Sequence, residues 1–465
     1  MRRMTTRTQA VVAVAGALAA GVASAGPTIG AGAVYGTAAA TPVDTHDWAL
    51  NAGFEHSDNI GRTIDARQSA SIVQAGLVVD FNDTRPHLQT RLATNLNYFD
   101  YLEGGYKSQV IGGLDGGLIA TLVPGALTWS AHDNFGQLAV DPTAVVTPGN
   151  IQNVNAFTTG PDVTLPLGRA NDLALHGEYS RIDYQESTDQ NNHKYMGSIS
   201  LVHRLSQTSS VSLGGSTTRT QYEDSLLSTS YDVRSETVGF DATGLRTTLS
   251  SSVGSTQLRY LGDTHSGLFA HLGLGRMIGT RSKLALDVGT QYQDSAGEFQ
   301  QAQTFNGVAP SVSDTVLSSD PFRSDYATAT WDITGVRSTL GFGLTFRKER
   351  HLTQTNLDRR EESATVTYSR RITSLLTFAL NGSYGRNRFA GDDTAVNGVP
   401  VNPTGGDVHL DSWSAGAGIG WTLTRSLALQ ARFDRQDGSG TGGNRNYTEN
   451  RAYIGIAFSD GRRGL

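Results

Sequence analysis

Apolar residues alternate with polar or small residues along most of the chain after Asp47, and this period of two limits the fold more than any other feature. In 340–347, Leu and Phe alternate with Gly, Thr and Arg, and in 413–421, Trp, Ala and Ile alternate with Ser and Gly. Successive side chains of a strand point to opposite faces, so each segment has one apolar and one polar face. Strands with lipid on one face and water on the other have this pattern.

The alternation also fixes the pairing of the strands. A slip by one residue would place charged side chains in lipid, so the register is well specified. The segment 245–260 is less regular, because its apolar residues change parity from Leu249 and Val253 to Leu258 and Tyr260. This change predicts a β-bulge there or a different boundary of the strand.

The connections between the segments alternate in length, which is a second signal. Tight joints at 83–86, 123–125, 278–282, 334–338 and 423–426 are separated by longer polar stretches at 136–153, 295–320, 389–409 and 436–446. Bacterial outer-membrane barrels have short periplasmic turns, long extracellular loops and an even number of strands. We therefore predict an all-β fold, a transmembrane antiparallel up-and-down outer-membrane barrel of 18 to 20 strands. A soluble β-sandwich or solenoid is the alternative, and the size and the turn pattern disfavour it.

The first residues have the pattern of an export signal. A basic start is followed by a short apolar run and by small residues at 23–25, so we expect a signal peptide at 1–25, with a second possible cleavage site near 38–40. A short periplasmic segment at 26–46, the barrel at 47–459 and a tail at 460–465 complete the predicted organisation. The short N-terminal segment predicts no plug domain.

The composition narrows the class of function. The chain has no cysteine, which excludes disulfides and thiolate metal sites and fits the oxidising periplasm. The formal net charge of −6 becomes −9 once Arg2, Arg3 and Arg7 of the signal peptide are removed. An acidic chain gives no support for nucleic-acid binding.

Aromatic residues predict the two membrane interfaces, because amphipathic rings prefer the level of the lipid headgroups. If odd-numbered strands run outward, the periplasmic girdle consists of Trp48, Trp129, Trp331 and Trp421. The opposite girdle consists of Tyr98 and Tyr195, and we place Tyr101, Tyr184 and Tyr260 there too.

The polar face of the strands predicts the wall of the lumen. Its charged candidates are Glu55, Asp80, Arg91, Asp115, Glu178, Arg204, Asp287, Asp332, Arg347, Arg432 and Asp434. A wall with both charges and many amides suits a hydrated, hydroxyl-rich passenger, which can exchange water for these groups. Any water-filled barrel also needs polar inward residues, and this explanation accounts for the set nearly as well.

No motif of enzyme chemistry stands out. The sequence has no G-x-S-x-G elbow and no paired histidines at metal spacing, and His132 is better explained as a solvated lumen residue than as part of a triad. The Asp/Gly-rich stretches 391–394 and 437–444 do not match a calcium loop. We expect no catalytic residue, no metal site, no cofactor and no enzymatic activity.

Three phrases resemble a known family: residues 53–60 (GFEHSDNI), 127–137 (LTWSAHDNFGQ) and 157–168 (FTTGPDVTLPLG). They are similar to the β-barrel porin 2 family, outer-membrane barrels associated with exopolysaccharide export loci. The resemblance extends over the mature chain through short motifs. It implies a terminal conduit that receives polysaccharide from separate periplasmic export proteins.

Three functions remain open from the sequence. The first is a channel for exopolysaccharide or capsular polysaccharide, and the second is a diffusion porin for small solutes. A long loop folded inward, at 136–153 or 295–320, would favour the second. The third is a non-conducting surface barrel for adhesion or scaffolding, and a hydrolase is a distant fourth. Expected partners are outer-membrane lipid and lipopolysaccharide, the polysaccharide passenger, the periplasmic export proteins and the barrel-assembly machinery.

Overall fold

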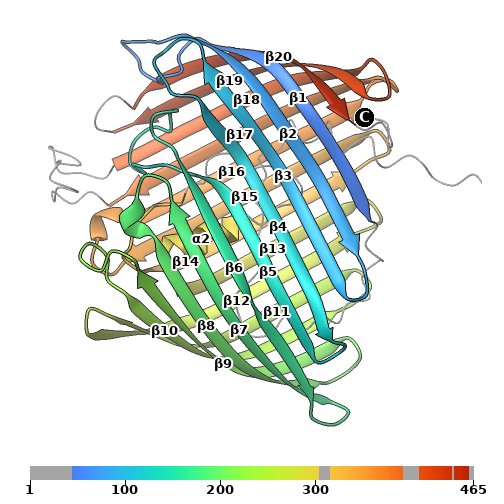
Figure 1. The fold of residues 1–465 in the computed structure, drawn as a ribbon, viewed down its shortest axis with the longest axis vertical. Coiled ribbons are helices and arrows are strands. Elements are labelled where there is room, and N and C mark those ends of the chain that lie inside the picture. Colours follow the sequence, from blue (N-terminus) through green and yellow to red (C-terminus); the bar gives the residue numbers. More distant parts are fainter. Residues whose placement is uncertain (1–43, 303–314, 391–407, 442–444, 460–465) are drawn as a thin grey trace, which may run out of the picture.

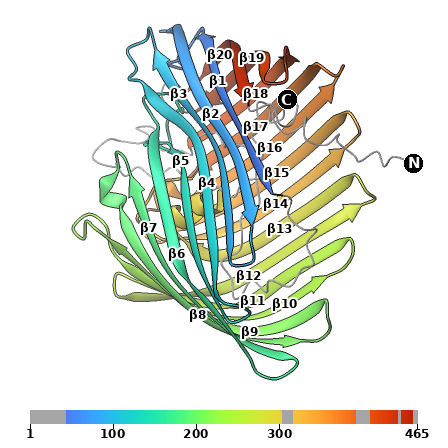
Figure 2. The ribbon, with the colours of Figure 1, turned by 45° about the vertical axis from the view of Figure 1, so that its right-hand side comes forward.

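The strands form one closed barrel. A computed structural model describes residues 44–302, 315–390, 408–441 and 445–459. In it, twenty strands form a single sheet in which each strand is antiparallel to its neighbours, and β1 pairs with β20 to close the ring. The strands are tilted across the wall (Figures 1 and 2). The predicted fold class is confirmed, at the upper of the two predicted strand numbers.

The first half of the barrel consists of β1 (Thr45–Ser57), β2 (Ala70–Thr84), β3 (Leu88–Tyr101), β4 (Gln109–Val123), β5 (Leu127–Leu138), β6 (Gln152–Pro166), β7 (Asn171–Tyr184), β8 (Asn192–Arg204), β9 (Ser209–Tyr222) and β10 (Tyr231–Thr243). The second half consists of β11 (Thr247–Tyr260), β12 (Asp263–Ile278), β13 (Ser282–Gln293), β14 (Phe322–Thr334), β15 (Ser338–His351), β16 (Arg359–Arg371), β17 (Leu376–Phe389), β18 (Val408–Thr422), β19 (Leu427–Gly440) and β20 (Tyr447–Ser459). The helices are α2 (Ser295–Ala302) and two 3₁₀ turns, η1 (Thr188–Gln190) and η2 (Thr355–Leu357).

The two ends of the barrel differ in their connections. At one end, nine turns of three or four residues join the strands pairwise. The start of β1 and the end of β20 lie at this end too, because Ala49 pairs with Ser459. Most connections at the opposite end are longer, and we call the two ends the short-turn end and the long-loop end. The predicted signal peptide, nearly all of segment 26–46 and the tail lie outside the described residues.

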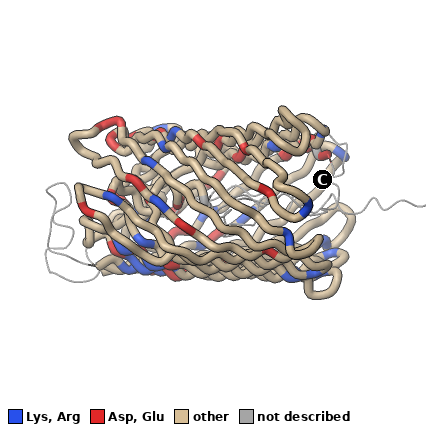
Figure 3. The backbone as a smooth tube through the Cα atoms, turned by 90° about the horizontal axis from the view of Figure 1, so that it is seen from below, with Lys and Arg blue, Asp and Glu red and all other residues tan. Residues whose placement is uncertain are grey.

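The outward face is apolar along the strands. The side chains of Leu213, Leu344 and Ile454 are between 55% and 61% exposed on this face. Charged residues of both signs are distributed along the wall (Figure 3). An apolar outer band around a polar interior is typical of barrels that cross a bilayer.

Among the described residues, no helix combines the length and the apolar composition needed to cross a membrane.

Strand β11 corrects one sequence expectation. It pairs with β10 and β12 without a shift in register, so the predicted bulge is wrong. The alternative, a different boundary, is correct, because the strand begins at Thr247 and Leu245 lies in the turn before it. The apolar parity changes because Leu258 and Tyr260 face inward, where they are 0% and 6% exposed and pack with Tyr222 and Tyr231. The inward side of this strand is therefore apolar at the long-loop end.

The ladder between β12 and β13 ends early. Pairing begins at Ala270 and Thr290, so the last three residues of β13 pair only with β14. Beyond Gln293 the chain leaves the wall and enters α2, which lies inside the ring of strands (Figure 1). This departure brings α2 into the lumen.

Candidate functional site: a loop segment folded into the lumen

Two described parts of the connection between β13 and β14, residues 294–302 and 315–321, fold into the barrel. They are here called the inward segment. Asp294 directly precedes α2 and caps it: its Oδ1 accepts a hydrogen bond from the backbone N–H of Gly297 at 2.8 Å. The loop 295–320 is one of the two stretches that the sequence marked for inward folding.

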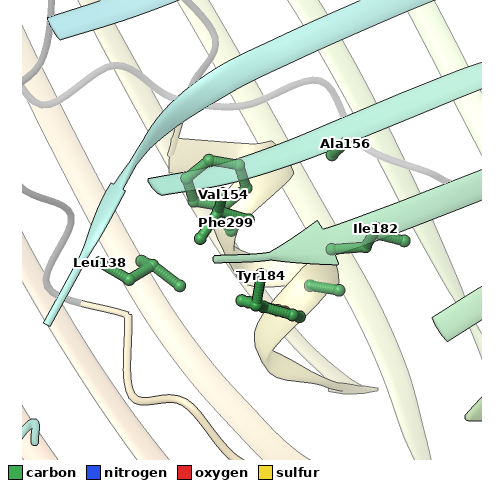
Figure 4. Close-up of a cluster of buried hydrophobic side chains, with 7 residues drawn as sticks. Leu138, Val154, Ala156, Ile182, Tyr184 and Phe299 are labelled. Carbon is green, nitrogen blue, oxygen red and sulfur yellow. The ribbon is translucent and has the colours of Figure 1, made fainter. Parts of the chain in front are cut away.

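A phenyl ring fixes α2 to one wall. Phe299 is fully buried in a cluster with Leu138, Val154, Ile182 and Tyr184, whose side chains come from β5, β6 and β7 (Figure 4). These strands lie six or more positions away from β13 around the ring. The helix therefore reaches across the lumen to a distant part of the wall.

An ion cluster fixes the same helix to another wall. The Glu298 carboxylate accepts hydrogen bonds from Arg347 of β15 and from Nη2 of Arg359 of β16, the latter at 2.9 Å. Arg359 also pairs with Glu349 at 2.7 Å and lies 3.6 Å from Glu361. All three carboxylates are buried.

The charges of this cluster do not balance when every group is ionised, because three carboxylates face two guanidinium groups. Burial, and then the negative charge of Glu349, raise the pKa of Glu298 to about 8. A proton on Glu298 therefore balances the cluster near neutral pH. Oxygen atoms of the three carboxylates lie within 4.8 Å of one another, a spacing that a cation also accepts, but Arg347 and Arg359 already donate to them.

A second buried pair holds the start of the inward segment. Lys194 of β8 contacts Asp294 Oδ1 at 2.5 Å, and the hydroxyl of Tyr231 donates to Oδ2 at 2.5 Å. Burial alone would favour the neutral acid, but the Lys194 ammonium and the Tyr231 hydroxyl hold the pKa of Asp294 below its usual value. Asp294 is thus a buried, compensated anion.

The returning half of the inward segment is anchored as well. Val316 is fully buried with Leu357, Phe389 and Val408. Asp320 Oδ2 accepts hydrogen bonds from the backbone N–H groups of Thr353 and Gln354, at 2.7 and 2.8 Å. Both described halves are therefore packed against the barrel.

Other long loops meet over the same end. Arg62 pairs with Glu449 at 2.9 Å, donates to Gln436 at 2.7 Å and donates to the carbonyl oxygen of Val146 at 2.5 Å. Arg445 donates to the carbonyl oxygen of Thr143 at 3.0 Å. The loop 139–151, near the second stretch proposed for inward folding, is thereby tied to the loops beside β1 and β20.

The structure brings some of the predicted lumen residues together. Glu55 is 1% exposed and pairs with Arg451 at 3.2 Å and with Arg432 at 3.5 Å, and Arg432 pairs with Asp434 at 2.5 Å. Arg347 binds Glu298 of the inward segment. Others form separate pairs: Arg91 with Asp115, Arg204 with Asp172 and Asp287 with His271 join neighbouring strands, whereas Glu178 pairs with His176 on the same strand, β7. Asp80 and Asp332 are exposed nearer the short-turn end.

The aromatic residues divide into two groups. Trp48, Trp129, Trp331 and Trp421 are 38% to 51% exposed on the outward face near the short-turn end, and Tyr98 and Tyr195 are exposed towards the opposite end. Tyr184 and Tyr260 do not belong to that outer girdle, because both are buried on the inward side. Tyr101 also packs inward, beside Ile72 and Tyr106. Around these three tyrosines the lumen wall is apolar, so parity in the sequence did not identify the lipid face there.

The sequence missed most of the residues that hold the inward segment. The sequence analysis did not identify Asp294, Glu298 and Phe299 of the segment. It also did not identify their partners Lys194 and Arg359. The only signal was weak: the polar loop contains a few large apolar residues, Phe299 among them, and such residues are often buried. The partners lie up to 161 residues away, as Phe299 and Leu138 do, and only the closed ring brings them near.

Comparisons with known proteins give structural likeness at low identity. No family model matches the chain, and no curated protein matches it. Among solved structures, the siderophore receptor PirA from Pseudomonas aeruginosa is 9% identical with a TM-score of 0.42, over 90% of this chain and 80% of that one. The FrpB iron transporter from Neisseria meningitidis, F3-3 variant, is 8% identical with a TM-score of 0.41, over 90% and 82%. OccK2 (OpdF) from Pseudomonas aeruginosa is 12% identical with a TM-score of 0.34, over 89% and 98%.

Proposed function

We propose that the chain is an outer-membrane channel for hydrophilic solutes whose lumen is narrowed by the inward segment. The observation that carries this proposal is the double attachment of α2. Phe299 packs on β5–β7 while Glu298 pairs with Arg347 and Arg359 of β15 and β16. An inward loop fixed at both sides reduces the free cross-section at the level where it lies.

The chemistry of the wall supports passage of hydrated solutes. Around Glu55 and around Arg347, charges of opposite sign lie within 3.5 Å of each other. Paired charges leave a small net field, so the channel is expected to discriminate mainly by size and hydrogen bonding and weakly by the sign of the solute charge.

Single-channel conductance of the refolded full chain in a planar bilayer tests the proposal. Replacing residues 296–318 with a Gly/Ser linker should increase the conductance and admit larger neutral solutes. The matched control replaces 225–227 in the β9–β10 loop, where Leu226 is 94% and Leu227 71% exposed. No current from either protein, or equal currents from the chain and the 296–318 variant, would contradict a channel constricted by the segment.

A polysaccharide conduit is the second candidate. The mixed charges and amides of the lumen favour it, together with the family resemblance of residues 53–60, 127–137 and 157–168. Under this proposal the partners are a polysaccharide passenger and separate periplasmic export proteins, while barrel-assembly machinery and lipopolysaccharide accompany either function. Reversible block of the current by long oligosaccharides would support it. Unchanged surface polysaccharide after deletion of the gene would contradict it.

A further inference from the structure

The nine short turns share a composition that turn geometry does not require. They are 85–87, 124–126, 167–170, 205–208, 244–246, 279–281, 335–337, 372–375 and 423–426. None of these nine contains Asp or Glu. Eight contain or directly follow an arginine, and we call these residues the arginine rim: Arg85, Arg169, Arg204, Arg246, Arg281, Arg337, Arg371 and Arg425.

Most rim arginines are available to a ligand. Arg85 pairs with Asp83 and Arg204 with Asp172, at 2.8 and 2.6 Å. By contrast, no carboxylate of the described residues forms an ion pair with the exposed Arg169, Arg246, Arg281, Arg337 or Arg425. The connections at the long-loop end differ, since they include exposed acids such as Glu186 and Glu223.

Exposed apolar side chains accompany the arginines. Leu245 and Val336 directly precede Arg246 and Arg337 and are 105% and 66% exposed. Leu423, two residues before Arg425, is 46% exposed and continues the outward alternation of Trp421. An apolar side chain that dips into lipid beside a cation that reaches the headgroups is a common arrangement at bilayer interfaces.

The tryptophan girdle gives the depth of the rim. Trp331 pairs with Leu284, three residues from Arg281, and Trp421 lies four residues before Arg425. At about 3.3 Å per residue, these separations are about 10–13 Å along tilted strands. Because tryptophan rings lie at the headgroup level and the strands are tilted, the long arginine side chains lie within reach of the phosphates.

We propose that the arginine rim binds the phosphate groups of anionic phospholipids in the periplasmic leaflet, all around the barrel. This proposal rests on the membrane placement in the proposed function but not on conduction. Guanidinium groups suit phosphate because they donate several hydrogen bonds to it. Arginines lie in or directly before eight of the nine turns, from the β2–β3 turn to the β18–β19 turn around the ring. A lipid leaflet also surrounds the barrel, so lipid phosphates can contact each of these arginines. A docked protein would need a binding surface that follows the whole ring.

Tryptophan quenching by brominated lipids tests the rim directly. The full chain is refolded into phosphatidylcholine vesicles that contain a rising fraction of brominated phosphatidylglycerol, with brominated phosphatidylcholine as the neutral probe. A Trp413→Phe background leaves only the four tryptophans near the short-turn end. We expect the anionic lipid to be preferred by about fivefold or more, a preference that falls at high salt.

Two matched variants separate the rim from general charge. R246Q/R281Q/R337Q/R425Q should bring the preference close to one, whereas R67Q/K107Q/R234Q/R259Q, which removes four exposed cations at the long-loop end, should leave it unchanged. Heat-dependent gel mobility verifies that both variants fold. Conductance should be the same in both, so loss of lipid preference and loss of the channel remain distinguishable.

Three results would overturn the proposal. The first is equal quenching by the two lipids, which would leave an acidic periplasmic protein as the occupant of the rim. The second is an equal loss of preference in both variants. The third is loss of the preference on addition of inorganic phosphate at constant ionic strength, which would identify a site for the free ion.

Discussion

Glu298 of α2 lies 2.9 Å from the Nη2 atom of Arg359 on β16, and the side chains of both residues are at most 1% exposed. Residue 299, the next along the chain, packs on the other side of the lumen. Two adjacent residues therefore hold one short helix between distant parts of the wall.

The attachment is expected to depend on pH through Glu298. Because burial and Glu349 raise its pKa from 4.5 to about 8, the attached state holds a proton that the detached state releases. The stabilising contribution is complete below pH 4.5, decreases as the pH rises to about 8, and is constant above that. Conductance should therefore rise over this window. Glu298→Gln, which keeps the neutral form at every pH, should lack this rise, and an unchanged pH profile would contradict the assignment.

Removing the phenyl ring should release α2. Phe299→Ala leaves a cavity against Leu138, Val154 and Tyr184 and should weaken the attachment by about 3–5 kcal/mol. Liposome swelling should then show faster entry of large neutral sugars. The control is Phe433→Ala on β19, where the ring is 51% exposed on the outward face. Equal swelling rates for the two variants would show that Phe299 does not restrict the lumen.

The buried pair of Lys194 and Asp294 should behave non-additively. Lys194→Met leaves the Asp294 carboxylate buried with only Tyr231 and the Gly297 N–H as donors, at a cost of about 3–5 kcal/mol. Asp294→Asn in the same chain removes the uncompensated charge and should restore much of the attachment. The measurement is the noise of the single-channel current, which should be lower in the double variant than in Lys194→Met alone. Additive effects would mean that the two residues are not coupled.

The two faces of β15 and β16 should respond differently to a charge. Leu344 lies at the middle of β15 and is 60% exposed on the outward face. Leu344→Arg should destabilise the barrel by about 2–4 kcal/mol, because it places a charge in lipid. Thr365→Arg on the inward face of β16 should cost less, because the lumen is hydrated. Urea unfolding from vesicles compares the two variants, and a reversed order would mean that the faces have been assigned the wrong way round.

Local sequence contained most of the information about the wall. Alternation is a property of neighbouring residues, so segments such as 340–347 predict both a strand and its outward face, and turn residues such as those at 278–282 predict where strands reverse. These local rules led to a closed barrel of eighteen to twenty strands, and the structure has twenty.

The interior of the long-loop end was decided only by tertiary structure. Tyr184 and Tyr260 are of the residue type that forms a lipid-facing girdle. They nevertheless line an apolar part of the lumen, because loops cover that part. Closing the ring brings Lys194 to Asp294 and Leu138 to Phe299, over separations of 100 and 161 residues. Periodicity reports which face a side chain occupies, whereas the partner across the lumen depends on how many strands close the ring and where one loop enters it.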